Sequence, residues 1–331
     1  PIGMIETVEA IKSHQHNLTP LNGKNTGRGV ASGFWMNGTG PACAIANVNF
    51  DGSVSLTIGS MDIGGTRPGA AQQFAEVLGI AVETVNPQVG DTDSIGYTSM
   101  TGGSGAAFKT GWASFEAAED VRRQMIERAA LIWEKPIEEI DLKNGLFCHK
   151  YDPKLQVNFK ELASKLGETG GPVVGKANLD PSGAGGAFAT HIVDLEVDIE
   201  TGKIKILRYT AAQDVGKAIH PSYVEGQIQG GAAQGIGWAL NEEYFYNDDG
   251  QMMNPTFLDY RMPISLDLPM IDTVVVEVTN PGHPFGVRGV GEVTLIPPMS
   301  AIANAIHDAV GTRLTNLPMT PGVVLESLGV K

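Results

Sequence analysis

The apolar and polar positions of the chain follow two different periods, and these predict both helices and strands. Over residues 112–135 apolar side chains recur on one helical face while acids and arginines occupy the other, which predicts a long amphipathic helix. Over residues 191–199 every second side chain is apolar, which predicts a strand with one buried and one solvated face. After Pro297 and Pro298, a helical spacing predicts a buried helix that ends at Gly311.

Shorter patterns complete the predicted elements. Residues 43–59 contain two apolar runs around an Asp-Gly turn, and a Glu-Thr-Gly turn at 200–202 leads into another apolar run, so two hairpins are expected. Residues 68–79 predict a short helix. Residues 223–241 are helical in composition but contain five glycines, which suits a helix packed closely against other backbone or a cofactor. Hairpins mixed with helices, without a repeating strand-helix-strand order, predict an α+β fold.

Two changes of composition suggest how the chain is divided. Residues 1–28 are polar and lack a strong period, so we interpret them as a connector that contributes little to a core. Residues 151–186 are rich in glycine, proline and lysine, and this favours a separation into two lobes. The lobes are predicted at 29–180 and 181–331.

The composition limits the classes of function. The 331 residues are 42% apolar, enough for sizeable cores, and the net charge of −14 without a basic run argues against nucleic acid or a membrane as partner. Cys43 and Cys148 are too few for a disulfide framework, a four-cysteine zinc site or an iron–sulfur cluster. No apolar run approaches about eighteen residues, and no export signal is evident. We therefore expect a globular cytoplasmic protein.

Glycine is unusually abundant, with 42 residues or about 13% of the chain against a typical ~7%. Glycine clusters in a folded protein usually mark a close approach of backbone to a ligand or to other backbone. The cluster at 101–111 resembles a phosphate-binding loop, but Lys109 follows Phe108 where such a loop requires glycine. The segment is therefore either a turn that caps the next helix or a loop whose N–H groups bind an anion.

A single carboxylate, Glu292, stands between a glycine-rich segment at 286–291 and an almost wholly apolar run. A carboxylate in apolar surroundings requires donors, a cation or a proton, so surface decoration does not explain it. Two interpretations stay open from this segment, an acid at a helix N-terminus and a catalytic acid or base. The seven histidines show no metal-ligand spacing, and no G-x-S-x-G nucleophile motif occurs.

Four segments occur in an order that resembles the molybdenum hydroxylases, the family of xanthine oxidase and aldehyde oxidase. They are SMDIGGTRPGAAQQFAEVLGI at 60–80, GDTDSIGYTSMTGGSGAAFKTG at 90–111, DVGKAIHPSYVEGQIQGGAAQGIGW at 214–238 and GVRGVGE at 286–292. Each segment alone is weak, whereas the ordered combination is specific. The resemblance covers nearly the whole chain and is to the second half of the molybdopterin-binding domain. It is similar to the medium subunit of enzymes in which that domain is split between two chains, such as nicotinate dehydrogenase.

The resemblance implies roles for residues in these segments. Glu292 matches the family's general base for hydroxylation. The residues that match the family's cofactor-binding positions are Gly102, Gly103, Ser104, Ala106, Gln227 and Gln234. Amide side chains suit such contacts because they both donate and accept hydrogen bonds. No side chain is implied as a direct metal ligand, since the pterin holds the molybdenum.

Two positions depart from the family's pattern. Many relatives have Gly-Gln-Gly where this chain has Gly64, Gly65 and Thr66, so a glutamine contact to the cofactor is not carried over. Many also have arginine at the position of Gly105. A contact to a dinucleotide phosphate is therefore in doubt there, although backbone N–H groups remain available.

The resemblance also implies an activity, cofactors and partners. The chain is expected to be a subunit of a hydroxylating dehydrogenase that uses molybdenum–molybdopterin, in its cytosine dinucleotide form, to insert water-derived oxygen at an electron-poor carbon of an N-heterocycle. Nicotinate, converted to 6-hydroxynicotinate, is the leading substrate. A large molybdopterin subunit, an FAD subunit and a [2Fe–2S] subunit are the implied partners. The alternatives are a xanthine or other purine, aldehyde or aryl-CoA dehydrogenase subunit, and a cofactor-binding protein without chemistry of its own.

Overall fold

The computed structural model describes residues 2–330 and divides into two compact units. Unit 1 comprises Pro1–Met36, Gly185–Thr279 and Arg288–Lys331. Unit 2 comprises Asn37–Ala184 and Asn280–Val287. Each unit combines helices with mainly antiparallel sheets, which confirms the α+β prediction.

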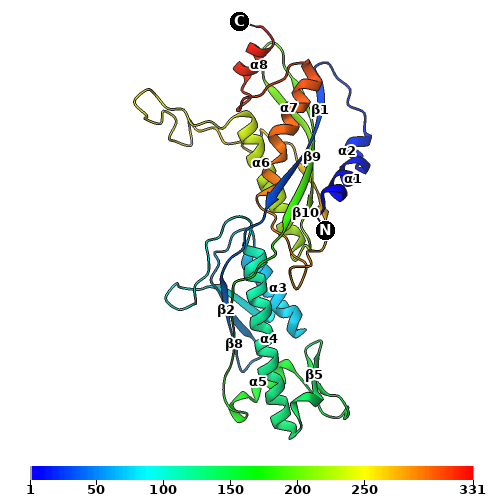
Figure 1. The fold of residues 1–331 in the computed structure, drawn as a ribbon, viewed down its shortest axis with the longest axis vertical. Coiled ribbons are helices and arrows are strands. Elements are labelled where there is room, and N and C mark those ends of the chain that lie inside the picture. Colours follow the sequence, from blue (N-terminus) through cyan, green and yellow to red (C-terminus); the bar gives the residue numbers. More distant parts are fainter. Residues whose placement is uncertain (1, 331) are drawn as a thin grey trace. The chain divides into compact units, whose positions relative to one another are not determined.

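Unit 1 is built on a four-stranded sheet with the strand order β1-β9-β10-β11 (Figure 1). The strands are β1 (Thr26–Met36), β9 (Gly186–Val197), β10 (Ile204–Asp214) and β11 (Ile271–Val276). β9 pairs antiparallel with both β1 and β10, whereas β11 runs parallel to β10. The register of β9 and β10 shifts between Ile206 and Arg208.

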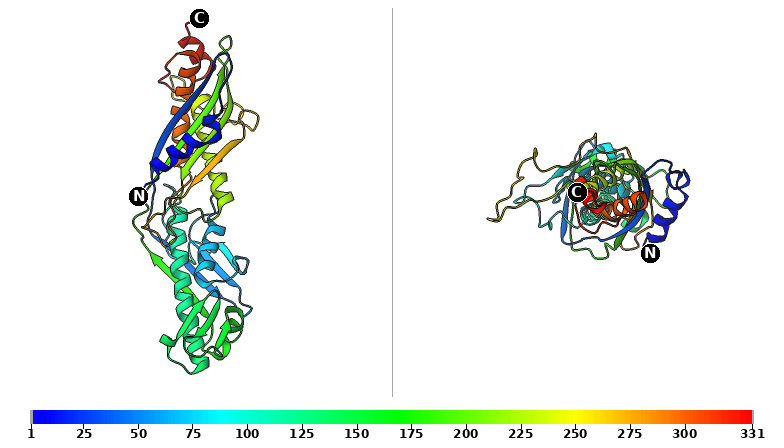
Figure 2. Two further views of the ribbon diagram at one scale, coloured as in Figure 1. Left: turned by 90° about the vertical axis from the view of Figure 1, so that its right-hand side faces the viewer. Right: turned by 90° about the horizontal axis from the view of Figure 1, so that it is seen from above.

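Helices cover both faces of this sheet. They are α1 (Met4–Ser13), α2 (Gln15–Leu18), α6 (Pro221–Leu240), α7 (Pro297–Val310) and α8 (Pro321–Ser327), with a short 3-10 helix η4 (Val293–Leu295) ahead of α7. α7 packs on β1 and β9, and α1 and α2 lie on the other side of the sheet (Figures 1 and 2). A Cβ atom on Gly29 of β1 would lie 1.9 Å from the carbonyl oxygen of Ala301, so α7 approaches this strand too closely for any other residue.

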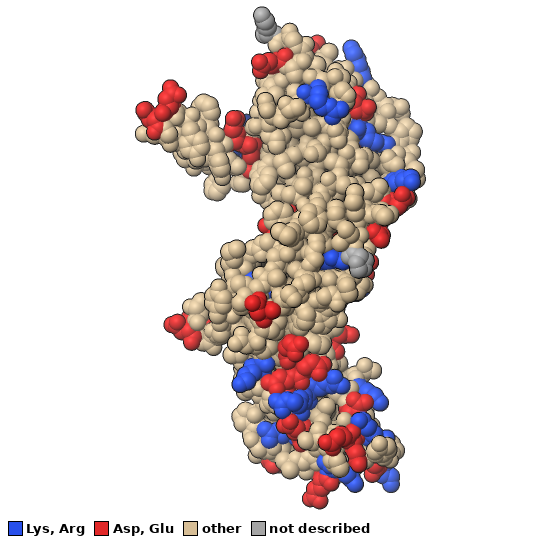
Figure 3. Space-filling view, viewed as in Figure 1, with Lys and Arg blue, Asp and Glu red and all other residues tan. Residues whose placement is uncertain are grey.

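Unit 2 has a four-stranded sheet in the order β4-β3-β2-β8, against which α4 packs, with α3 packed on α4. These elements are β2 (Ala42–Val48), β3 (Val54–Ile58), β4 (Val85–Val89), β8 (Val173–Leu179), α3 (Thr66–Leu78) and α4 (Ala106–Trp133). A smaller sheet and helix follow α4, with β5 (Ile140–Lys143), β6 (Leu146–His149), β7 (Gln156–Asn158) and α5 (Phe159–Ser164). Single 3-10 turns complete the unit at Val82–Thr84, Ile137–Glu139 and Leu166–Glu168. Charged side chains of both signs are interspersed over the α4 and α5 region (Figure 3).

The strongly periodic segments fold as predicted. The helix after Pro297 ends at Gly311, which adopts the left-handed conformation of a C-terminal cap. The two predicted hairpins are β2–β3 and β9–β10. The helix predicted over 112–135 is α4, which begins six residues earlier at Ala106 and ends at Trp133. The helix predicted over 68–79 is α3.

The segment at 1–28, predicted as a connector, contains a helix that packs on the sheet of unit 1. Residues 4–13 form the helix α1, and Ile11 is buried against the sheet of unit 1. The segment at 151–186 is likewise not a simple separator, since it contains β8, which pairs with β2 along its whole length. One of its glycines, Gly175, is buried within β8, where a Cβ atom would lie 2.3 Å from the carbonyl oxygen of Ala117 in α4. The two contact-defined units therefore interleave along the chain and differ from the predicted lobes at 29–180 and 181–331.

The predicted solvated face of β9 is confirmed at Glu196, which is exposed, and wrong at Asp194. Asp194 is fully buried and pairs with Arg28 of β1 (Nε to Oδ1, 2.7 Å), with Arg208 of β10, and with His16 (Nε2 to Oδ2, 3.2 Å). Burial opposes ionisation, but the hydrogen bonds from His16, Arg28 and Arg208 hold the pKa of Asp194 well below its usual range. The polar face exists as predicted, but helices α1 and α2 cover the part of it around Asp194. No helix within residues 2–330 is long and apolar enough to cross a membrane.

Candidate functional site

Glu292 lies in unit 1 at the junction between an irregular loop and the short helix η4. It is the N-cap residue of η4 and half-buried, and its side chain makes no capping hydrogen bond to that helix. α7 starts only at Pro297, with Ile296 as its N-cap, so Glu292 is not in the first turn of α7 either. The interpretation of Glu292 as an acid that satisfies a helix N-terminus is therefore not supported.

The backbone just before Glu292 is held by a buried ion pair. Arg288 is 2% exposed, and its Nε lies 3.1 Å from Oδ2 of Asp214, which is fully buried at the end of β10. The same guanidinium donates to the carbonyl oxygens of Val278 (3.1 Å) and Gly186 (2.9 Å). We call this group the Arg288 brace. Burial raises the pKa of Asp214, against the opposing effect of Arg288 and of backbone N–H donors.

Two further side chains fix the loop on either side of Glu292. Gln213, fully buried, donates from Nε2 to the carbonyl oxygen of Val290 at 2.8 Å. Thr294 donates from Oγ1 to the carbonyl oxygen of Ile228 in α6 at 3.0 Å. The loop that carries Glu292 is thus attached to the end of β10 on one side and to α6 on the other.

Four of the five glycines of α6 separate into two pairs, and the fifth, Gly237, lies against Glu242. A Cβ atom on Gly231 would lie 2.0 Å from Thr294, and one on Gly235 would lie 2.6 Å from Pro298, so these glycines allow α6 to pack against η4 and α7. A Cβ atom on Gly226 or Gly230 would meet nothing within 4 Å. The second pair therefore leaves an open strip on α6 that packing within the chain does not explain.

The two candidate glutamines lie on this same helix. Gln227 is half-buried and directly follows Gly226, while Gln234 is exposed and lies one helical turn beyond Gly230. Unit 1 thus carries the carboxylate and both amides on a connected set of elements, η4 and α6. The other four candidates, Gly102, Gly103, Ser104 and Ala106, belong to unit 2.

In unit 2 the candidate residues form a tight turn at the start of α4. Gly103 and Ser104 both adopt left-handed backbone angles, with φ of 61° and 57°, and the N–H of Gly38 donates to the carbonyl oxygen of Gly103. A Cβ atom on Gly105 would lie 2.7 Å from the carbonyl oxygen of Gly38. This close approach explains why glycine, and not the arginine of many relatives, stands at position 105. The side chain of an arginine there would collide with the backbone of Gly38.

Two polar residues near this turn were missed from the sequence. Asn37, beside Gly38, is 7% exposed, and neither of its amide atoms has a hydrogen-bond partner among the described residues. Lys109 is 1% exposed, and its Nζ donates to the carbonyl oxygens of Ser99 (2.9 Å) and Met100 (2.8 Å) and to the hydroxyl of Ser99 (2.6 Å). Burial lowers the pKa of Lys109. Asn37 does not stand out in sequence, and Lys109 stands out only for its position after the glycine cluster, because their burial follows from the fold.

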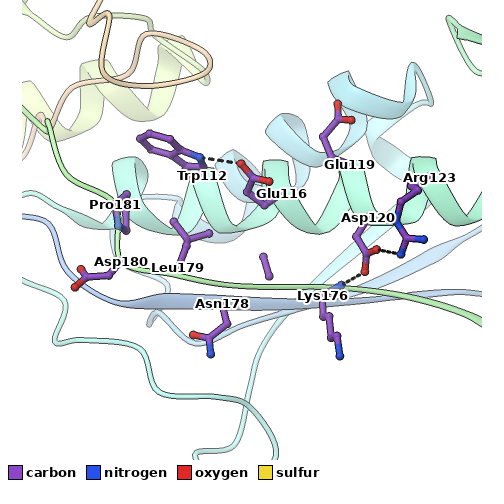
Figure 4. Close-up of a pocket in the computed structure, with 11 residues that line it drawn as sticks. Trp112, Glu116, Glu119, Asp120, Arg123, Lys176, Asn178, Leu179, Asp180 and Pro181 are labelled. Carbon is purple, nitrogen blue, oxygen red and sulfur yellow. Dashed lines mark hydrogen bonds and ion pairs between the residues drawn. The ribbon is translucent and has the colours of Figure 1, made fainter.

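The open groove of about 890 Å³ in unit 2 does not coincide with these residues. It lies between α4 and the chain at 176–181, and one pair of its charged side chains, Arg123 and Asp120, is joined at 2.6 Å (Figure 4). None of the candidate residues lines it. Within residues 2–330 no group of three or more His, Cys, Asp or Glu side chains is arranged to hold a metal ion.

Comparison with known proteins places the chain in a family. A family model described as a molybdopterin cofactor-binding domain matches residues 6–269. The putative xanthine dehydrogenase molybdenum-binding subunit of Escherichia coli K12 is 32% identical over 302 residues, covering 89% of this chain and 40% of that protein. The nicotine 6-hydroxylase large subunit of Paenarthrobacter nicotinovorans is 32% identical over 297 residues, covering 86% and 36%.

Solved structures agree with this placement. Quinoline 2-oxidoreductase from Pseudomonas putida 86 matches with a TM-score of 0.83 at 27% identity, over 99% of this chain and 45% of that one. The Cu,Mo-CO dehydrogenase matches with a TM-score of 0.84 at 23% identity, which shows a shared fold. The chain spans less than half the length of each of these proteins. On the match over residues 6–269 and the relatives of 32% identity, the chain belongs to the molybdenum hydroxylase family and consists of a molybdopterin cofactor-binding domain.

Proposed function

We propose that this chain is the subunit of a hydroxylating dehydrogenase that supplies the catalytic carboxylate, Glu292, and part of the molybdopterin site. The observation that carries the proposal is the way the fold holds the side chain of Glu292. The side chain of Glu292 is half-buried, makes no capping hydrogen bond to η4, and belongs to a loop attached both to the end of β10 and to α6. A carboxylate held in this way suits a general base, whose position relative to the substrate must be fixed.

The residues present fit the cofactor. The open strip at Gly226 and Gly230 is a surface that a Cβ atom would fill, and Gln227 beside it offers both a donor and an acceptor. In unit 2, α4 begins without a side-chain cap, so its first N–H groups suit a phosphate of the cytosine dinucleotide form. The buried amide of Asn37 has no hydrogen-bond partner within residues 2–330 and is a further polar group that could bind the cofactor.

Each set of residues has a distinct part in the proposed reaction. Gln227, Gln234 and the turn at 102–106 would hold the molybdenum–molybdopterin, which when bound supplies the two-electron acceptor for hydroxylation. A carboxylate oxygen of Glu292 would accept the proton of the water-derived oxygen as that oxygen attacks the substrate carbon. The Arg288 brace and Gln213 would keep this carboxylate oxygen at a fixed position during the proton transfer.

The substrate and the partners are also proposals. We assign the activity to an electron-poor carbon of an aromatic N-heterocycle, with nicotinate as substrate and 6-hydroxynicotinate as product. The relative named as a nicotine 6-hydroxylase subunit supports a pyridine-type ring. A purine is the second candidate, because the relative named as a xanthine dehydrogenase subunit is equally similar at 32% identity. A large molybdopterin subunit, an FAD subunit and a [2Fe–2S] subunit would complete a cytoplasmic enzyme, and the two free cysteines suit that reducing compartment.

The test is made on the complex purified through a tag on this chain from its source cell. Glu292→Gln should retain the molybdenum content of the unaltered complex and lose at least about 100-fold in kcat, because a general base contributes roughly 10²–10⁴-fold. Glu225→Gln, at an exposed position on α6, is the matched control and should leave both values unchanged. Turnover of nicotinate and xanthine is compared in the same preparation. Retention of most of the activity by Glu292→Gln would contradict the catalytic role, and an intact complex without molybdenum would contradict the proposed function.

A further inference from the structure

Residues 241–270 of unit 1, here called the arm, contain no helix or strand beyond one isolated bridge between Tyr246 and Met252. The arm connects α6 to β11 and stands out from the body of its unit beyond α6 (Figure 1). Ten of its large apolar or aromatic side chains are exposed, namely Tyr244, Phe245, Tyr246, Met253, Phe257, Leu258, Met262, Ile264, Leu266 and Met270. Monomeric proteins rarely expose so much apolar surface in one place, so the arm has the character of an interface.

Polar contacts hold the arm in shape. Tyr260 donates its hydroxyl hydrogen to Glu242 at 2.8 Å, and Asn254 donates to the carbonyl oxygen of Glu243 at 2.7 Å. The hydrogen bond to Glu242 raises the pKa of Tyr260 to about 12. The N–H of Met253 donates to the carbonyl oxygen of Phe245 at 2.7 Å, so the two limbs of the arm are tied together. These contacts join polar groups within the arm, while its large apolar side chains stay exposed.

The most exposed side chains identify the contact points. Phe257 is 88% exposed, Leu258 85% and Leu266 89%, and none of the three contributes to a core of unit 1. They would act as anchors that insert into apolar pockets of a partner. Exposure this complete also means that changing them removes no packing from this chain.

The charge of the arm narrows the choice of partner. The arm carries six carboxylates and a single basic residue, Arg261, and acidic side chains lie at its tip in the space-filling view (Figure 3). A complementary surface has apolar pockets with lysines or arginines around them. A second copy of this chain fits poorly, because the chain as a whole has a net charge of −14.

The molybdenum-binding relatives indicate which polypeptide the arm could contact. The family match extends to residue 269, so the arm belongs to the cofactor-binding domain and is not an appendage. This chain covers only 40% of the xanthine dehydrogenase molybdenum-binding subunit, so that relative contains further polypeptide with no counterpart in this structure. A domain completed by a second polypeptide requires a large apolar contact between its parts, and the arm is the largest exposed apolar segment of this chain.

We propose that the arm is the docking element for the polypeptide that supplies the remaining length of the molybdenum-binding relatives, with Phe257, Leu258 and Leu266 as its anchors. The identity of that polypeptide rests on the proposed function, in which it is the large molybdopterin subunit. The docking itself is measured independently of catalysis.

The first experiment is site-specific photocrosslinking in the source cell, with Phe257 replaced by p-benzoylphenylalanine. We expect the crosslinked peptide, identified by mass spectrometry, to belong to a polypeptide that matches the part of the relatives not covered by this chain. Crosslinks to a second copy of this chain, to an FAD or iron–sulfur subunit, or to no protein would overturn the proposal.

The second experiment measures assembly. The double variant Leu258→Asp/Leu266→Asp should reduce the amount of that polypeptide that copurifies by at least about tenfold. The control is Leu131→Asp, at a leucine of α4 that is 59% exposed and lies outside the arm, and it should not alter copurification. Unchanged copurification in the double variant would also overturn the proposal. Molybdenum and turnover are measured on the same preparations, so a complex that lacks both but crosslinks as expected would contradict the proposed function and leave the docking intact.

Discussion

The Arg288 brace offers a direct test of how the catalytic loop is positioned, through the substitution Arg288→Met. Methionine replaces much of the aliphatic volume of the arginine but removes its charge and its donors. Asp214 is then left buried without its guanidinium, while the N–H groups of Gly3, Gly216 and Val278 still donate to it. Removing one partner of a buried ion pair typically costs about 3–5 kcal/mol. The remaining donors to Asp214 place the expected cost near the lower end, at about 3 kcal/mol.

The assay is amide hydrogen exchange on the purified complex, read over peptides that cover 286–295. A loss of about 3 kcal/mol in local opening free energy corresponds to roughly 150-fold faster exchange there. We also expect kcat to fall while the molybdenum content and the KM stay near their original values, because Arg288 holds the loop that carries Glu292. The matched control is Arg313→Met, since Arg313 is exposed and bonds only to Asn304.

The same substitution should make the stability of the loop depend on pH. Burial already raises the pKa of Asp214, and removal of Arg288 raises it further. A carboxyl group whose pKa is higher in the folded state than in the unfolded state, where it is about 3.9, stabilises the fold when it is protonated. This stabilisation is complete at a pH below the unfolded pKa and is lost as the pH rises through the folded pKa. Exchange in Arg288→Met should therefore slow as the pH is lowered toward 4, after correction for the intrinsic rate. The additional change Asp214→Asn should recover part of the lost protection, because no charge is then buried. Unchanged exchange and unchanged kcat in Arg288→Met would refute the reasoning.

Two further predictions use contrasts within one unit. Gly230→Ala should stabilise α6 by about 0.5–1 kcal/mol, because alanine favours a helix more than glycine does. It should nevertheless lower the molybdenum content of the complex, because the open strip at Gly230 is proposed to face the cofactor. Gly231→Ala should instead destabilise the complex by about 1–3 kcal/mol, because the new Cβ atom would lie 2.0 Å from Thr294. Thermal unfolding and metal analysis of both variants check this, and an unaltered molybdenum content in Gly230→Ala would exclude the strip as a cofactor surface. In unit 2, burial lowers the pKa of His283 to about 4. The free energy of unfolding should therefore fall by roughly 3 kcal/mol as the pH falls from about 6.5 to 4. His283→Phe should remove this pH dependence in acid unfolding experiments. An equally steep acid transition in His283→Phe would contradict it.

Local patterns predicted the elements with a strong period, and long-range contacts decided what those patterns could not. α7 and α4 were predictable because each has an apolar face of several turns and, for α7, a glycine at its end. Asp194 occupies the polar face of β9 as expected, but the sequence could not show that a helix from residues 4–13 covers that face. The alternation of a strand gives the chemistry of its two faces and not what lies on them.

The candidate site shows the same division. Glu292 was singled out from seven residues of sequence and a resemblance, whereas its brace joins Arg288 to Asp214, 74 positions earlier in the chain. The glycines of α6 look alike in sequence, and only the fold separates Gly231, which lies against Thr294, from Gly230, which faces open space. Contacts of this kind depend on the packing of η4 on α6, for which no local pattern exists.

The position of the brace explains why a buried charge is used so close to Glu292. Gln213 and Asp214 are consecutive residues at the end of β10, so their side chains leave opposite faces of the strand and contact the loop at Val290 and Arg288. An apolar contact would hold the loop against the sheet but would not fix its register, because apolar surfaces slide at little cost. A buried ion pair is a poor source of stability, yet it has one favourable geometry. We infer that the brace is retained for register, and that Glu292 is positioned by the end of β10 rather than by the helix that follows it.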